Sequence, residues 1–105
     1  MTLYFESHVT IEPVYGERLE ELQIIALKYK FRVAELLMQK RKEDTPERSK
    51  NDTFCSSRSS SYKDLYNRMI ELCVALNKNH YKVWRYKIED VVIDSKIKDS
   101  CSLLQ

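Results

Sequence analysis

The sequence predicts an α+β domain built in the order strand, helix, strand, strand, helix, strand. Two segments alternate between apolar and polar side chains, as a strand with one covered face does. Two others repeat apolar side chains at helical spacing, and two short stretches between them favour strands. The expected strands are residues 3–12, 31–39, 53–57 and 82–94, and the expected helices are residues 17–30 and 62–78.

Composition places the chain among single-domain globular proteins. Its 105 residues, 43% hydrophobic and 32% charged, are enough for one hydrophobic core. The formal net charge of +2 is far below that of a generic nucleic-acid binder. We expect one domain over residues 1–95, followed by a C-terminal tail at 96–105.

Cysteine usage and hydropathy indicate a cytoplasmic protein. Cys55, Cys73 and Cys101 are odd in number and none lies two residues from another, so they predict free thiols rather than disulfides or a zinc site. No apolar run approaches the roughly 18 residues of a membrane span, and the first residues lack the pattern of an export signal. We therefore expect no membrane contact, no metal ion and no cofactor.

The first strand and the first helix have clear signals. Val9 and Ile11 alternate with His8 and Thr10, which puts the two pairs on opposite faces of the strand. Pro13 ends this strand because proline has no N–H to donate to a neighbouring strand. The helix then begins with glutamates in its first turns, where the helix dipole favours negative charge.

The segment between the two helices is harder to interpret. Residues 31–39 are dense in apolar side chains but alternate poorly, which leaves the register of this strand open. Residues 40–52 contain no large apolar side chain and predict an exposed loop that is more mobile than the strands it joins. Residues 53–57 predict a short strand in which Phe54 is the expected core residue.

The second helix and the last strand complete the order. Ser61 is the expected N-cap of the helix, with Asp64 three residues later, as in a capping box. In the last strand, Trp84 and Tyr86 alternate with basic residues, and we expect both aromatic side chains to face the core.

This order of elements most often folds as a ferredoxin-like domain, a four-stranded antiparallel sheet with both helices on one face. Right-handed crossovers give the strand order 4-1-3-2, with the first strand between the third and the fourth. The other face of the sheet is then open, and we expect any chemistry to lie there. The side chains expected on that face are His8, Thr10, Glu12, Thr53, Cys55, Ser57, Arg85 and Lys87.

A His-x-Thr pattern is the most specific motif on this face. His8 and Thr10 lie two residues apart on one strand, so their side chains project from the same face about 6 to 7 Å apart along the backbone. An imidazole and a hydroxyl at that spacing can contact one phosphoryl group. Here the chain resembles half of a two-histidine (2H) phosphoesterase. That resemblance implies catalytic roles, with His8 as general acid or base and Thr10 holding the phosphate.

The second histidine motif of that family is missing. The other histidine, His80, follows the second helix and is not part of a His-x-Thr pattern. A complete 2H-like site would need a second chain, so a homodimer is one expectation. The simpler interpretation is that His8 is a surface histidine and Thr10 an ordinary strand residue, which favours a protein that is not an enzyme.

Basic and hydroxyl side chains near this face are candidate ligand contacts. They are Arg85 and Lys87 on the last strand and Ser57 and Arg58 before the second helix, where free N–H groups can also hold an anion. For residues 56–61 the alternative is a polar loop that ends in a helix cap. For the two basic residues of the last strand, the alternatives are an RNA-binding platform with nearby aromatic residues and a solvated row of charges.

Four segments together resemble a family of small uncharacterised proteins encoded by large bacteriophages. They are residues 7–14, 30–38, 51–58 and 82–95. This resemblance implies a phage or bacterial setting, with the host cytoplasm as the location if the protein is phage-encoded, and it implies no particular reaction.

Two hypotheses about function follow. The favoured one is a small non-catalytic interaction protein, such as a phage factor that binds a host protein or a phosphate-containing ligand through its open sheet face. The alternative is 2H-phosphoesterase-like binding or hydrolysis of a nucleotide phosphoester, in a site completed by a second chain. A His8 in a pocket with Arg58 and Arg85 would favour the alternative, and a flat, exposed His8 would favour the interaction protein.

Overall fold

The computed structural model describes residues 2–34 and 52–92, and the six elements in these ranges follow the expected order. Most of the expected second strand, residues 40–51 of the expected loop and the expected tail lie outside the described residues. The elements are β1 (Tyr4–Ile11), α1 (Glu17–Lys28), β2 (Arg32–Val33), β3 (Thr53–Ser59), α2 (Tyr62–Lys78) and β4 (Val83–Val91).

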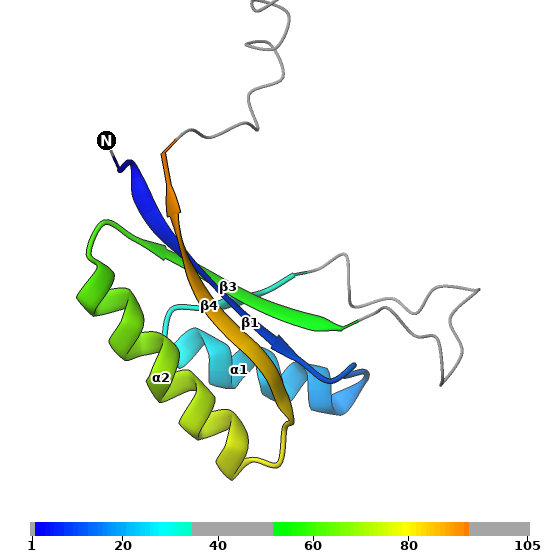
Figure 1. Cartoon of the computed structure of the whole chain (residues 1–105). Coiled ribbons are helices and arrows are strands. Elements are labelled where there is room, and N and C mark those ends of the chain that lie inside the picture. Colours follow the sequence, from blue (N-terminus) through cyan, green and yellow to red (C-terminus); the bar gives the residue numbers. More distant parts are fainter. Residues whose placement is uncertain (1, 35–51, 93–105) are drawn as a thin grey trace, which may run out of the picture.

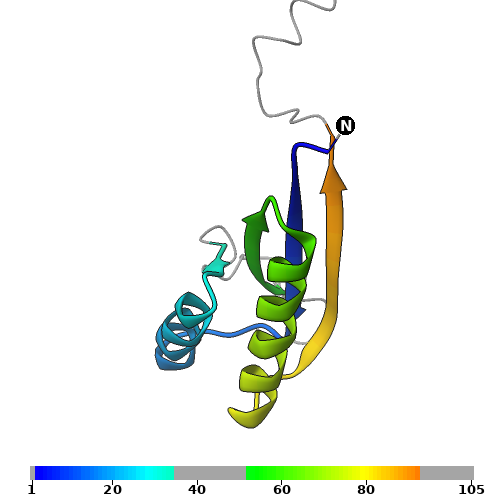
Figure 2. The same ribbon diagram turned by 90° about the vertical axis from the view of Figure 1, so that its left-hand side faces the viewer.

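The four strands form one antiparallel sheet in the order β2-β3-β1-β4. α2 packs against β1, β3 and β4, and α1 packs against α2 and β2, so both helices cover the same face of the sheet (Figures 1 and 2). The ferredoxin-like prediction and the predicted strand order are therefore confirmed. None of the elements in residues 2–34 and 52–92 covers the other face, which is called the open face below.

Both helices begin where their sequences predict; α2 also ends there, and α1 ends at Lys28, two residues before its predicted end. The Ser61 hydroxyl accepts a hydrogen bond from the Asp64 backbone N–H at 3.2 Å, which caps α2. α1 follows Gly16, whose φ of +62° is strained for a residue with a Cβ atom. Each helix buries one stripe of four side chains against the sheet. The stripes are Leu19, Leu22, Ile25 and Ala26 in α1, and Leu65, Met69, Leu72 and Leu76 in α2.

The hydrophobic core lies between these stripes and the covered face of the sheet. Val9 and Ile11 of β1 are fully buried in it, and so is Phe31, which follows α1. Tyr81, between α2 and β4, is also buried, and its hydroxyl donates to the Arg18 carbonyl oxygen at 2.8 Å. This hydrogen bond joins the start of α1 to the start of β4.

Arg68 on α2 holds three parts of the fold together. Its guanidinium donates to the Tyr29 carbonyl at 2.9 Å, the Ser57 hydroxyl at 2.7 Å and the Arg58 carbonyl at 3.1 Å. Its Nε also pairs with the Asp64 carboxylate at 3.1 Å, and this hydrogen bond lowers the pKa of Asp64. The largely buried arginine therefore connects α2 with β3 and with the end of α1.

Candidate functional site

The open face of the sheet, the side away from both helices, carries polar side chains from all four strands. Residues directly opposite each other in antiparallel strands point to the same side, so the strand pairing identifies the side chains on this face. Its polar and aromatic members are Arg32 from β2, Phe54, Ser56 and Arg58 from β3, Tyr4, Glu6, His8 and Thr10 from β1, and Arg85, Lys87 and Glu89 from β4.

His8 and Thr10 occupy the middle of two neighbouring rows on the open face. Each is flanked by one side chain from β3 and one from β4, and opposite side chains in such a sheet have Cβ atoms about 4.5–5.5 Å apart. The structure therefore brings the His-x-Thr pair together with the two basic residues of β4. The rows are Arg32, Ser56, His8 and Lys87, and Phe54, Thr10 and Arg85.

Glu6 connects the side chains at the other end of this face. One of its carboxylate oxygens lies 3.6 Å from His8 Nε2, and the other lies 3.5 Å from Arg58 Nε. The Arg58 guanidinium also stacks over the Tyr4 ring, 4.8 Å from its centre. His8 is 30% exposed in this network. The alternation of β1 predicts that Glu6 and His8 share this face, but it does not predict that Glu6 joins His8 to Arg58.

A second ion pair lies along β4. The Lys87 ammonium contacts the Glu89 carboxylate, and the hydrogen bond between them lowers the pKa of Glu89, with smaller contributions from the charges of His8 and Arg85. Within the described ranges, Arg85 makes no ion pair. Arg32 of β2 makes none there either, but it lies opposite Ser56, whereas Arg85 lies directly opposite Thr10. Arg85 is therefore the cation best placed to receive an anion together with Thr10.

β3 presents the opposite set of side chains to the helices from the set that the sequence predicts. Cys55 and Thr53 pair with buried residues of β1 and face the helices, with 0% and 1% of their surface exposed. The Ser57 hydroxyl, on the same side, donates to the Lys30 carbonyl at 2.6 Å. The prediction that these three residues lie on the open face is wrong, because β3 has no alternating apolar run to set its phase. Burial raises the pKa of Cys55 to about 12, so its thiol is no nucleophile at neutral pH.

Two of the aromatic side chains lie elsewhere than predicted. Phe54, expected in the core, is half-buried on the open face opposite Thr10. Trp84, expected to face the core, is 55% exposed. Tyr86 does lie on the helix side, opposite the buried Val9, but on this edge strand it stays 53% exposed. A β-bulge near the start of β4 leaves Trp84 without a partner on β1, which interrupts the alternation on which the prediction depended.

The serine-rich segment before α2 is a helix cap. Besides the cap on Asp64, the Ser61 backbone N–H donates to the Ser59 hydroxyl at 3.0 Å. Ser57 and Arg58 point to opposite faces of the sheet. The anion site that they were expected to form together is therefore not assembled.

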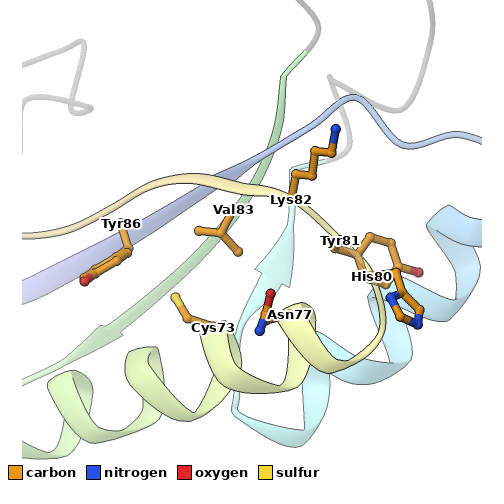
Figure 3. A pocket seen from close by; sticks show the side chains of 7 residues that line it. All are labelled: Cys73, Asn77, His80, Tyr81, Lys82, Val83 and Tyr86. Atoms are coloured by element: carbon orange, nitrogen blue, oxygen red, sulfur yellow. The ribbon is translucent and has the colours of Figure 1, made fainter.

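A pocket of about 580 Å³ lies on the helix side of the sheet, between the end of α2 and β4. Figure 3 shows Cys73 and Asn77 of α2 facing Val83 and Tyr86 of β4. Burial raises the pKa of Cys73 to about 11, so its thiol is protonated at neutral pH. His80 also lines this pocket, apart from the open face.

Comparison with known proteins gives no further information about this face of the sheet. No model of a known protein family matches the chain, and no curated protein matches it. In residues 2–34 and 52–92, no three His, Cys, Asp or Glu side chains gather where they could hold a metal ion. Neither of the helices in the described residues is long and apolar enough to cross a membrane.

Proposed function

We propose that this chain is a non-catalytic binding protein that takes a phosphate-containing ligand, such as a nucleotide or another phosphate ester, on its open face. One observation carries the proposal: His8, Thr10, Arg85 and Lys87 occupy adjacent positions on neighbouring strands. An imidazole, a hydroxyl, a guanidinium and an ammonium group are the side chains that hold phosphoryl oxygens most often.

The row around Thr10 is the best position for the phosphate. Arg85 lies directly opposite Thr10, so one phosphoryl group can accept hydrogen bonds from both side chains. Phe54 lies on the other side of Thr10 and offers an aromatic surface on which a base can stack. This row therefore has the parts to hold a nucleotide with its phosphate toward β4 and its base toward β3.

Carboxylates limit where an anion can bind. Glu6 and Glu89 lie one row beyond His8 and repel a phosphate placed near them. Each also pairs with a cation of the same face, Arg58 or Lys87. We expect modest affinity that falls with added salt, because a partly exposed charge cluster is screened by ions.

The missing second imidazole supports binding without catalysis. In acid–base cleavage of a phosphoester, one group removes a proton and another donates one. His80 lines the pocket on the helix side of the sheet and cannot serve this face. Hydrolysis of a nucleotide phosphoester in a site completed by a second chain stays the alternative.

A protein partner is the second candidate. Trp84 is 55% exposed and neighbours Arg85 in sequence. Tryptophan and arginine are the side chains that most often dominate the binding energy of protein interfaces. In this second candidate, the chain is a phage factor and its partner is a host protein.

Calorimetric titration with cyclic and linear nucleotides tests the proposal. We expect one nucleotide class to bind, and His8→Ala and Arg85→Ala each to weaken binding by at least about tenfold, the equivalent of losing one charge-assisted hydrogen bond. Lys63→Ala is the matched control, because it removes an exposed positive charge on α2 and should leave affinity unchanged.

Two results would contradict the proposal. Wild type that binds no nucleotide would leave the open face to a protein partner, and unchanged binding by His8→Ala would remove His8 from the site. The stability of His8→Ala should stay within about 1 kcal/mol of wild type, because a half-exposed side chain contributes little to the core. Chemical denaturation checks this, so that lost binding is not mistaken for unfolding.

A further inference from the structure

β4 is an edge strand with a long free side. In the order β2-β3-β1-β4 it pairs only with β1, over Val83–Val91. Its backbone N–H and C=O groups on the outer side have no strand to pair with among the described residues. Such an edge can template the addition of another strand.

Apolar side chains lie along this edge. Trp84 and Tyr86 on β4 and Val92 directly after it are each at least half exposed. Natural edge strands are usually kept from pairing by short length, bulges or charges. The bulge of β4 lies near its start, so it leaves Arg85–Val91 regular.

The charges on this regular part of β4 are complementary to those of a second, antiparallel copy of the same strand. Lys87 and Glu89 flank Ile88 with opposite signs, and both lie on the open face. If a second β4 pairs antiparallel about a twofold axis through Ile88, Lys87 of each chain lies opposite Glu89 of the partner subunit. Opposite charges in directly opposed positions stabilise a strand pair, and no like charges face each other in this register.

We infer that the chain forms a homodimer in which the β4 strands of two copies pair antiparallel about a twofold axis through Ile88. The side chains on the helix side fit this register too. The two Ile88 side chains meet at the axis, and the Tyr86 phenol faces the Asp90 carboxylate of the partner subunit, which can accept its O–H.

The helices leave room for this pairing. α2 packs under β1, β3 and β4, which places its centre near β1. Strands lie about 4.8 Å apart, so the two β1 strands, and with them the two α2 helices, would be about 14 Å apart. Packed helices are about 8–10 Å apart, so the copies do not collide. The two His8 side chains are separated by a similar distance, too far to act on one phosphate, so this dimer does not complete a 2H-like site.

Sedimentation equilibrium over a range of concentrations tests the dimer without any ligand. We expect the wild type to be dimeric at high micromolar concentration. Lys87→Glu places a glutamate opposite Glu89 of the partner subunit, and the twofold axis repeats this repulsive pair. The variant should therefore weaken association by at least about tenfold. Glu89→Lys should do the same, and the double variant Lys87→Glu with Glu89→Lys should restore the dimer. Lys28→Glu on α1 changes the net charge equally and should have no effect.

Other outcomes overturn the inference. A wild type that stays monomeric at every concentration would leave the β4 edge unpaired or open to a strand from another protein. A dimer that survives both single charge reversals would use another surface. Because the readout is mass rather than nucleotide binding, failure here leaves the proposed ligand site untouched, and failure of that site leaves the dimer untouched.

Discussion

The two faces of the central strand differ although their residues alternate along one short segment. Ser7, Val9 and Ile11 of β1 are fully buried beneath the helices, whereas His8 and its neighbours on the open face are half exposed. The covered face contacts the helix stripes and the open face contacts solvent and charged side chains. Stability and binding chemistry therefore depend on different residues of the same strand.

This separation means that a substitution on the covered face should change the free energy of unfolding, and a substitution on the open face should change binding. The contrast can be tested with pairs of equal substitutions, one at a buried side chain and one at an exposed side chain. Where a pair fails to differ, the division between the two faces is wrong at that position.

The largest effect is expected in the core. Leu72→Ala on α2 removes a fully buried side chain and should lower the free energy of unfolding by about 3 kcal/mol, through lost burial and a cavity. Leu27→Ala on α1 makes the same chemical change at a side chain that is 64% exposed, and should stay within about 0.5 kcal/mol of wild type. Urea denaturation measures both. Equal losses would mean that Leu27 is covered in solution.

Arg68 and Arg58 make a second pair. Arg68→Met should cost about 2 kcal/mol, because it leaves the Ser57 hydroxyl and two backbone carbonyls without their donor. Arg58→Met on the open face removes an ion pair whose arginine is 50% exposed, and should cost about 0.5 kcal/mol or less. A larger loss for Arg58→Met than for Arg68→Met would reverse the assigned roles.

Ser7 offers a change of opposite sign. Its hydroxyl is fully buried and has no hydrogen-bond partner in the described structure. Ser7→Ala removes this unsatisfied group and should raise the free energy of unfolding by roughly 1 kcal/mol. Thermal and urea unfolding check the gain. A clear loss of stability would show that the hydroxyl has a partner in solution.

The smallest effect is a change in acid stability. The hydrogen bond from Arg68 lowers the pKa of Asp64 below that of the unfolded chain. Its stabilising contribution is therefore present above the unfolded pKa of about 4 and is lost as pH falls through the folded pKa. Between about pH 5 and pH 2, Asp64→Asn should lose less stability than wild type. Parallel stability curves across this range would rule out a contribution from Asp64.

Much of the fold was predictable from local pattern. The alternation of β1 identified both of its faces, and the helical stripes and the Ser61 cap located α1 and α2 to within two residues at each end. Strand order followed from element order, because right-handed crossovers leave few arrangements. For the same reason, the meeting of His8 and Thr10 with Arg85 and Lys87 was predictable before the structure.

The phase of β3 was not predictable, and neither was the bulge of β4. Residues 53–59 read Thr-Phe-Cys-Ser-Ser-Arg-Ser, and their largest apolar side chain, Phe54, lies on the open face. The pairing of β3 with β1 buries Cys55 and Thr53 instead. The bulge at Trp84 likewise depends on how β4 meets β1, so alternation alone assigned Trp84 to the wrong environment. Alternation did put Tyr86 on the helix side, but it could not show that this side chain stays half exposed.

By itself the sequence determined the elements, their order in the sheet and the side chains that β1 presents on each face, because periodicity and chain connectivity are local properties. Only the tertiary structure decided which side of β3 is buried, where Trp84 lies and that Glu6 joins His8 to Arg58. These features depend on the register between strands that are far apart in the chain. A register shift of one residue exchanges the two faces of a strand at no local cost.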